Sequence, residues 1–228
     1  MMYDLLLELP IFQGLSYEQL TLILEKVPFH FKKYRNNENL VTAGDRCEEV
    51  IFLLSGRVRM ITPVFGDKIV ISEDFDAPHT IPFSNFFGHE VRSRCGVYAQ
   101  GAVGAMTLNK ANFLTMLENN RLMLINVLNI LSTHAQKNHY ALDSIGEKEP
   151  EMRLASWLLA YTQRPAKNII VDASAEDWCS LLHVDAETLQ KTIKILAEEK
   201  YLEFDSGKMK LTDRYGLRTY VSRNKALK

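Results

Sequence analysis

The chain has 228 residues, of which 46% are hydrophobic and 24% are charged, and its 27 lysines and arginines nearly balance its 28 aspartates and glutamates. This composition excludes a disordered chain, a collagen-like fibre and a tail that binds nucleic acid through bulk charge. No segment has the roughly 18 uninterrupted apolar residues that a membrane span requires, and the first residues lack a basic start and a small-residue cleavage site. We therefore expect no membrane partner, and the three dispersed cysteines, which argue against a disulfide scaffold, favour a reducing cytoplasm.

Residues 1–30 are predicted to be largely helical. Ser16 is a favourable N-cap for one helix, because its hydroxyl can accept a hydrogen bond from a backbone N–H of the first turn. Pro28 ends the pattern, since proline cannot continue a helix. Between them lies an apolar stripe with helical spacing, formed by Leu20, Ile23, Leu24 and Val27.

Residues 31–108 are predicted to form short β-strands separated by glycine-containing turns. The turns are expected at Gly44-Asp45, Ser55-Gly56 and Gly66-Asp67. The predicted strands are Leu40–Thr42, Val50–Leu54, Arg57–Thr62, Ile69–Ser72, Val97–Ala99 and Val103–Leu108. Many short strands with regular turns are typical of an antiparallel barrel or sandwich.

From Asn109 onward the periodicity becomes helical. Steps of alternately four and three residues give Leu117, Arg121, Leu124, Leu128, Leu131, Ala135, Asn138, Leu142 and Ile145, most of them apolar. Such a seam belongs either in the core of a helical bundle or at a contact between two subunits. Because one β domain cannot bury all of it, we predict a dimerisation helix at about residues 110–146, with contacts through Leu117, Leu124, Leu128, Leu131, Ala135 and Leu142.

The polar segment Gly146–Pro150 is predicted to separate two domains, residues 1–146 and residues 147–228. In the second domain, residues 174–202 have the pattern of a helix-turn-helix. Ser174 caps the first helix, His183-Val184 interrupts the pattern, and Asp185 caps the second helix. A hairpin that turns at Ser206-Gly207 follows directly, and a hairpin in this place is the wing of a winged helix.

The second helix of this pair carries a polar face that suits the major groove of DNA, where base edges present donors and acceptors. The candidate DNA-contacting residues on this face and on the wing are Glu187, Thr188, Gln190, Lys191, Lys194, Lys208 and Lys210. The tail adds further basic residues, namely Arg214, Arg218, Arg223, Lys225 and Lys228. Residues 151–228 hold 13 basic and 11 acidic residues, a small excess for a nucleic-acid binder. The alternative is a polar face that contacts other proteins.

The order of these parts resembles regulators of the Crp/Fnr superfamily. The resemblance is carried by Ile11–Ser16, by Ala43–Asp45, by Ser55–Val58 and by Asp185–Thr188. It implies an α+β fold with an N-terminal antiparallel β-roll of the cyclic-nucleotide-binding type, a long dimerisation helix and a C-terminal winged helix-turn-helix. It also implies a homodimer that reads a near-palindromic site in double-stranded DNA, an effector bound in the β-roll, and RNA polymerase as a further partner.

The expected effector site departs from that of the cAMP-binding relatives. Their phosphate cassette has a Gly-Glu pair and an Arg-Ser pair, whereas this chain has Pro82 and Phe83, then Ser93 and Arg94, at the matching positions. Phe83 cannot accept a hydrogen bond from a ribose hydroxyl, so we do not expect cAMP. The resemblance implies that an unidentified effector, either polar or else apolar or aromatic, contacts Phe83, Ser93, Arg94, Asn138 and His139.

Metal cofactors are not expected. The three cysteines, Cys47, Cys95 and Cys179, are dispersed, so neither a zinc site nor the iron–sulfur cluster of the oxygen-sensing relatives is predicted. The histidines that could serve a haem have no convincing partner and are expected to be solvated or locally hydrogen-bonded; they are His79, His89, His134 and His139.

The recognition helix also departs from the family pattern, because Ala186 and Lys191 stand where many members have arginine. Lysine keeps the charge but lacks the planar fork of arginine, so a different site sequence is expected. No phosphate loop, nucleophile elbow or His-Glu-x-x-His motif is present, which argues against an enzyme. The sequence thus predicts a transcription regulator, and the alternative is a ligand-binding β-roll dimer whose winged helix binds proteins.

Overall fold

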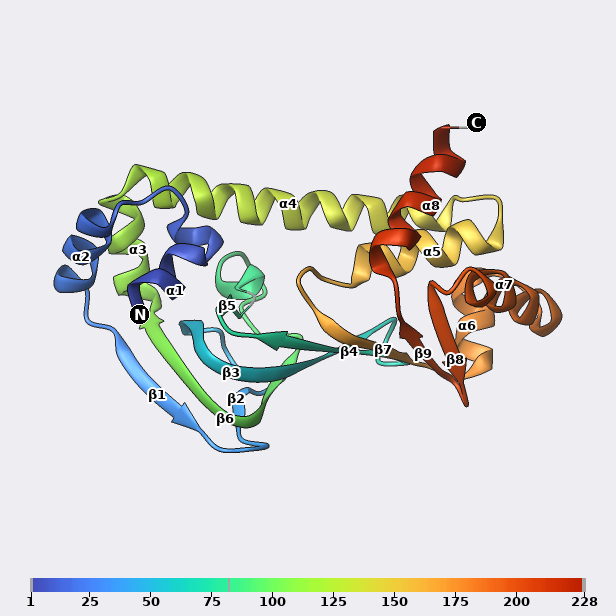
Figure 1. Cartoon of the computed structure of the whole chain (residues 1–228), viewed down its shortest axis with the longest axis horizontal. Coiled ribbons are helices and arrows are strands. Elements are labelled where there is room, and N and C mark those ends of the chain that lie inside the picture. The colour runs from blue at the N-terminus through green and yellow to red at the C-terminus, as the bar shows by residue number, and fades with distance from the viewer. Residues whose placement is uncertain (1, 82, 227–228) are drawn as a thin grey trace. The chain divides into compact units, whose positions relative to one another are not determined.

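The computed structural model describes residues 2–81 and 83–226, and these divide into two compact units (Figure 1). The N-terminal unit consists of residues 1–60 and 75–134, and the C-terminal unit consists of residues 61–74 and 135–228. The C-terminal unit is therefore built from two separate stretches of chain. The predicted boundary at residues 146 and 147 lies in the turn between two helices and stays a prediction.

Helices occupy both units. In chain order the helices of the described residues are α1 (Met2–Glu8), the 3-10 helix η1 (Pro10–Phe12), α2 (Tyr17–Lys26), the 3-10 helix η2 (Ser84–Phe86), α3 (Lys110–Glu118), α4 (Arg121–Ile145), α5 (Pro150–Tyr161), α6 (Ala175–Leu182), α7 (Ala186–Glu198) and α8 (Arg214–Ala226). Within the part of the chain that the structure describes, none of them is long and apolar enough to cross a lipid bilayer.

The strands alternate with these helices. They are β1 (His30–Tyr34), β2 (Asn39–Val41), β3 (Glu49–Val64), β4 (Ile69–Asp76), β5 (His79–Thr80), β6 (Gly96–Asn109), β7 (Lys167–Asp172), β8 (Leu202–Asp205) and β9 (Lys208–Leu211). Among the described residues the hydrogen-bonded order is β1-β6-β3-β4-β7-β9-β8, with β2 also on β6 and β5 on β3. The β1–β6, β4–β7, β7–β9 and β8–β9 pairs are antiparallel. The predicted fold class is confirmed.

The N-terminal unit is organised around an aromatic core. Phe113 of α3 is fully buried, and its ring lies 5.9 Å from Phe83, 5.6 Å from Phe86 and 6.5 Å from Phe87. The prediction of a helix capped by Ser16 is confirmed, because the Ser16 hydroxyl accepts the backbone N–H of Gln19 and the Gln19 side chain accepts that of Ser16.

One of the predicted turns was wrong, and one pair of predicted strands is a single strand. The Ser55-Gly56 turn lies inside β3, and the two strands predicted at residues 97–108 are the single strand β6. Gly56 has φ +85°, and a side chain there would collide with the carbonyl oxygen of Ala102. Glycine is therefore needed for a local distortion and a close backbone approach within the strand rather than for a chain reversal.

The predicted helix of about residues 110–146 is also wrong, because it is broken into α3 and α4. Asn119 ends α3, and the side chain of Asn120 accepts the backbone N–H of Met123 to start α4. Asparagine side chains compete for backbone hydrogen bonds and so favour helix ends. Leu117 consequently lies on α3 and is only 5% exposed, so its assignment to the dimer seam was wrong.

The C-terminal unit has its own apolar core under α5, α6 and α7. Trp178 of α6 is fully buried, and its ring meets that of Trp157 edge-on at 5.6 Å. Ile69 and Ile71 of β4 are fully buried in the same cluster, although they come from early in the chain. Helix α8, which the sequence did not predict, adds Leu217 and Val221 to this core.

Candidate nucleic-acid interface

The helix-turn-helix of the C-terminal unit is held by local backbone hydrogen bonds. The Ser174 hydroxyl accepts the backbone N–H of Asp177 at the start of α6, and His183 ends α6 in the left-handed conformation with φ 51°. Asp185 caps α7 by accepting the backbone N–H of Thr188 at 2.8 Å, and this hydrogen bond holds the pKa of the Asp185 carboxyl below its usual range. The predicted caps are confirmed.

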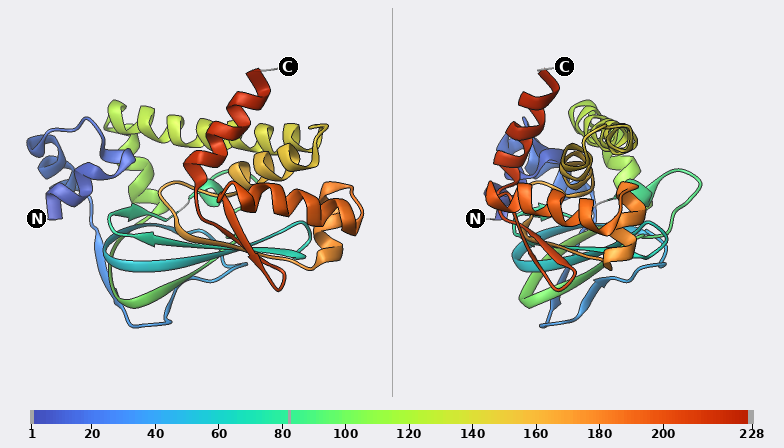
Figure 2. Two further views of the ribbon diagram at one scale, coloured as in Figure 1. Left: turned by 45° about the vertical axis from the view of Figure 1, so that its right-hand side comes forward. Right: turned by 90° about the vertical axis from the view of Figure 1, so that its right-hand side faces the viewer.

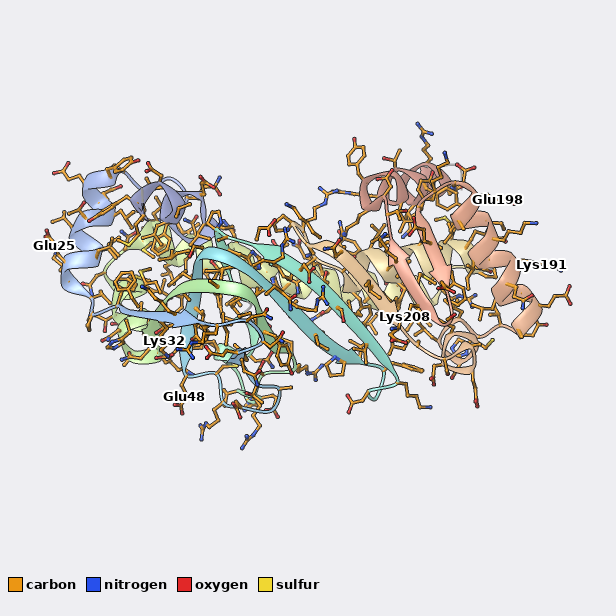
Figure 3. The ribbon with its side chains drawn as sticks, turned by 60° about the horizontal axis from the view of Figure 1, so that its bottom comes forward. Glu25, Lys32, Glu48, Lys191, Glu198 and Lys208 are labelled. Carbon is orange, nitrogen blue, oxygen red and sulfur yellow. The ribbon has the colours of Figure 1, made fainter. Side chains whose placement is uncertain are left out.

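Helix α7 presents one apolar and one polar face. Leu189, Ile193 and Leu196 are buried against the core, whereas the candidate reading residues Glu187, Gln190, Lys191 and Lys194 are exposed and Thr188 is half-buried. Figure 3 shows Lys191 and Glu198 projecting outward from the helix. The structure therefore brings the five predicted residues of α7 together on the solvent-facing side of one helix.

The wing is formed by β8 and β9, which are joined by a tight turn (Figure 2). Ser206 and Gly207 have φ values of 50° and 87°. Two-residue turns that join hairpin strands often require such positive φ values at both central residues. Lys208 and Lys210 lie on β9 with exposed side chains, and Figure 3 labels Lys208 there. The predicted hairpin is confirmed.

Each lysine proposed to contact DNA has a carboxylate partner. Lys191 lies 2.6 Å from Glu187, Lys194 lies 3.7 Å from Glu198, Lys208 lies 3.8 Å from Asp172 and Lys210 lies 3.2 Å from Glu203. All eight side chains are at least half exposed, so each pair contributes little to stability. A phosphate could replace the carboxylate at each lysine, although the paired charges reduce the attraction of this surface for DNA.

The basic tail is only partly available for binding. Arg214 is half-buried and donates to the carbonyl oxygens of Leu159 and Thr162 and to the Thr162 hydroxyl. Arg218 and Arg223 are exposed on α8, and Lys228 lies outside the described residues. The helix could have been found from the sequence, because Leu217 and Val221 are four residues apart in an otherwise polar segment.

The predicted effector residues divide between the two units. Phe83 and Ser93 line one pocket of about 340 Å³ in the N-terminal unit, with Asp45, Cys47 and Glu49 among the other lining residues. Arg94 is exposed, and Pro82 lies outside the described residues. Asn138 and His139 are exposed on the part of α4 that belongs to the C-terminal unit. The assignment of all five residues to one site stays a prediction.

One histidine differs from expectation. His79 was expected to be solvated or locally hydrogen-bonded, but it lies on β5 with its ring stacked on Phe75 at 4.3 Å. Its Nε2 is buried without a hydrogen-bond partner in the described structure, and burial lowers its pKa to about 4. His79 is therefore a half-buried side chain whose neutral form is favoured, rather than a solvated one. No cluster of His, Cys, Asp or Glu suited to a metal ion occurs in residues 2–81 and 83–226.

Most of the remaining seam residues of α4 are open to solvent. The exposed fractions are 39% for Leu124, 53% for Leu128 and 68% for Leu142. Ala135 is also exposed and Leu131 is half-buried. The opposite side of the helix buries Met123, Val127 and Ala141. The helix thus has a second apolar stripe that its own chain does not cover.

Comparison with known proteins places the helix-turn-helix and the overall fold. Residues 152–220 match the Crp-like helix-turn-helix domain. The solved structure of the Thermus thermophilus catabolite activator protein is 18% identical, with 94% of this chain and 99% of that chain covered and a TM-score of 0.54. A CooA mutant from Carboxydothermus hydrogenoformans is 17% identical, with 90% and 92% covered and a TM-score of 0.50. At these identities the likeness shows the fold. No curated protein sequence matches the chain.

Proposed function

We propose that this chain, which has the catabolite-activator fold and a Crp-like helix-turn-helix domain at residues 152–220, is a DNA-binding transcription regulator of the Crp/Fnr type rather than an enzyme. The observation that carries the proposal is α7, a capped helix whose exposed face presents Glu187, Gln190 and Lys191. A helix of this width fits the major groove, where those side chains meet base edges. The regulator would act in the cytoplasm, with RNA polymerase as a further partner.

Binding to double-stranded DNA is tested with duplex fragments enriched from random sequence. The enriched duplex should bind about 10³-fold more tightly than random duplex, and the association constant should fall steeply with salt because phosphate contacts release counterions. A weak affinity that is equal for all duplexes and independent of salt would contradict the proposal. That outcome would favour a winged helix that binds proteins, for which the paired lysines are the supporting observation.

Single substitutions distinguish the side chains that read bases from those that contact phosphate. Glu187→Ala and Lys191→Ala should each reduce discrimination between bases, by about 1–3 kcal/mol per lost base contact. Lys208→Ala should instead weaken binding to all sequences alike, because a lysine on the wing contacts phosphate. Lys33→Ala, at an exposed lysine of β1 in the N-terminal unit, is the matched control and should change nothing. Equal losses on every sequence for all three variants of the C-terminal unit would exclude α7 as the reading helix.

The homodimer is the second part of the proposal. The exposed stripe of Leu124, Leu128 and Leu142 on α4 supports it, since so long an apolar stripe is stabilised by burial against a second copy. A two-fold dimer would place its two reading helices about 34 Å apart, one turn of DNA, and would therefore read a near-palindrome.

Sedimentation of the free protein tests the dimer. Leu128→Glu places a charge on the stripe and should convert the dimer into a monomer. Asn129→Glu is the matched control, because Asn129 is exposed on α4 away from the stripe. A wild-type monomer at micromolar concentration, or dissociation by both variants alike, would contradict a dimer formed through this stripe.

A small effector that is not cAMP completes the proposal. The pocket of about 340 Å³ lined by Phe83 and Ser93 supports it, because its volume suits a small ligand. Phe83 is 6% exposed and offers no acceptor for a ribose. Addition of cAMP should therefore leave the melting temperature unchanged, whereas a small-molecule extract of the host should raise it through binding to the folded state. A rise with cAMP that Ser93→Ala abolishes would overturn the exclusion of cAMP.

A further inference from the structure

The sheet of the winged helix contains a strand from a distant part of the chain. Strand β7 pairs with β9 of the wing along one edge and with β4 along the other, in the register Val70↔Asp172 and Ile71↔Val171 (Figure 1). Residues 61–74, called the hairpin tip here, belong to the C-terminal unit, whereas the rest of β3 and β4 belongs to the N-terminal unit. The hairpin tip thus covers an edge that would otherwise expose unpaired N–H and C=O groups.

The hairpin tip is held by apolar contacts and by a buried carboxyl group. Ile69 and Ile71 are fully buried in the core of the C-terminal unit. Glu73 is 1% exposed, and its Oε1 accepts the backbone N–H of Gln163 at 2.6 Å. Its neighbour Asp74 is 2% exposed and accepts the side-chain amide of Asn168. A charged carboxylate in such a place is costly unless nearby groups compensate for the lost water.

Compensation for a charge on Glu73 is incomplete. The cationic groups that act on it are Arg214 of α8 and Lys137 of α4. Arg164, which follows α5, acts in turn on these two cations, and Asp74 is the neighbouring carboxyl group on the strand. The guanidinium of Arg214 donates to Leu159 and Thr162. Burial therefore raises the pKa of Glu73 to about 7, against the smaller opposing effects of the Gln163 N–H, Arg214 and Lys137.

We propose that the hairpin tip is a proton-responsive latch on the winged helix: β4 stays added to the sheet while the Glu73 carboxyl is protonated, and it is released more often when that carboxyl is ionised. In the released strand Glu73 is in water and has its ordinary acidity, so raising the pH favours release. With pKa values of 4.5 and about 7 for the released and latched forms, the fraction released rises about tenfold between pH 6 and pH 8. The latch does not depend on DNA binding.

Amide hydrogen exchange of the full chain tests the latch at the level of single strands. After correction for intrinsic rates, residues 69–74 and the facing edge of β7 should open about tenfold more often at pH 8 than at pH 6. Glu73→Gln should remove this pH dependence, since the amide is similar in shape and cannot ionise. Glu25→Gln, at an exposed glutamate of α2 (Figure 3), is the matched control and should retain it.

The β8–β9 hairpin is the internal reference in the same experiment. Its exchange should not follow the change in β4, because only one edge of the sheet is released. An unchanged pH dependence in Glu73→Gln would overturn the proposal. A parallel change in β8 and β9 would also overturn it, because the whole unit would then be unfolding.

A covalent lock gives a second test that does not depend on the Gln variant. Val70 and Asp172 face each other across β4 and β7, so the pair Val70→Cys and Asp172→Cys should form a disulfide when the three native cysteines are replaced by serine. The oxidised protein should lose the pH-dependent exchange of β4, and its reduction should restore it. The control is a distant pair, Val70→Cys with Lys194→Cys. The latch would be contradicted if the Val70–Asp172 pair formed no more disulfide than this control. It would also be contradicted if the exchange of β4 still depended on pH after the disulfide had formed.

Discussion

The two units differ in what their cores contain. The N-terminal core is formed mainly by aromatic and aliphatic side chains, such as Phe12, Phe52 and Phe113. Of the polar residues that are buried in the described structure, Thr107 alone belongs to the N-terminal unit; those of the C-terminal unit are Glu73, Asp74, Ser144, Ser156, Thr162 and Thr192. The C-terminal unit is assembled from two separate stretches of chain, and the joint between them is where its carboxyl groups are buried. Sensitivity to pH near neutrality should therefore reside in the C-terminal unit, whereas His79 of the N-terminal unit, whose pKa is lowered by burial to about 4, responds in acid.

The largest expected effect on stability comes from truncating one large buried side chain in each core. Phe113→Ala should lower the free energy of unfolding of the N-terminal unit by about 3–5 kcal/mol, and Trp178→Ala should do the same in the C-terminal unit. Both tryptophans of the chain, Trp157 and Trp178, lie in the C-terminal unit. In Phe113→Ala the urea midpoint seen by tryptophan fluorescence should move less than the midpoint seen by far-ultraviolet circular dichroism. Coincident shifts would show that the two cores unfold together.

Two glycine substitutions test the close backbone approach in β3 of the N-terminal unit. Gly56→Ala should cost about 2–4 kcal/mol, because the left-handed backbone and the collision with the Ala102 carbonyl both oppose a side chain. Gly44 has a similar φ of +90°, but a methyl group added there would meet no atom within 4 Å, so Gly44→Ala should cost only about 1 kcal/mol. Thermal unfolding compares the two variants, and equal losses would mean that the close approach in β3 is unimportant.

The contrast in buried charge predicts a pH profile. The pKa of Glu73 is raised to about 7 from 4.5, so its protonated form stabilises the fold fully below pH 4.5, and this contribution is lost as the pH rises through 7. Relative to wild type, Glu73→Gln should therefore gain about 1–3 kcal/mol of stability between pH 4.5 and pH 8, with no further gain above that range. Urea unfolding at a series of pH values measures the difference, and a constant difference would contradict the distinction between the cores.

The smallest expected effects come from the helix caps, which are similar in the two units. Ser16→Ala should cost about 0.5–2 kcal/mol, and Asp185→Ala should also lower stability, because each leaves a backbone N–H of a first helical turn without its acceptor. Circular dichroism during thermal unfolding measures both losses. The Asp185 variant should also become less sensitive to acid, since the lowered pKa of that carboxyl makes the cap lose strength as the pH falls through its titration. If Ser16→Ala changed the acid sensitivity by the same amount, the effect could not be assigned to the Asp185 carboxyl.

Local features of the fold were predicted well from the sequence. The caps at Ser16, Ser174 and Asp185, the helix-turn-helix and the wing turn depend on residues within a few positions of one another, and all were found. The errors arose where one residue type serves two purposes. Gly56 was interpreted as a turn although it lies within a strand, and the Asn119-Asn120 break was missed inside an apolar repeat.

The sequence by itself determined which residues form the reading helix, its cap and its wing, because hydrogen bonding and periodicity over short stretches specify them. Only the tertiary structure decided that β4 completes the sheet of the winged helix, that Arg214 faces inward and that Glu73 is buried beside Gln163. These contacts join residues 52 or more positions apart. Pairing between such distant segments is selected by the packing of the whole unit, which no local pattern of residues records.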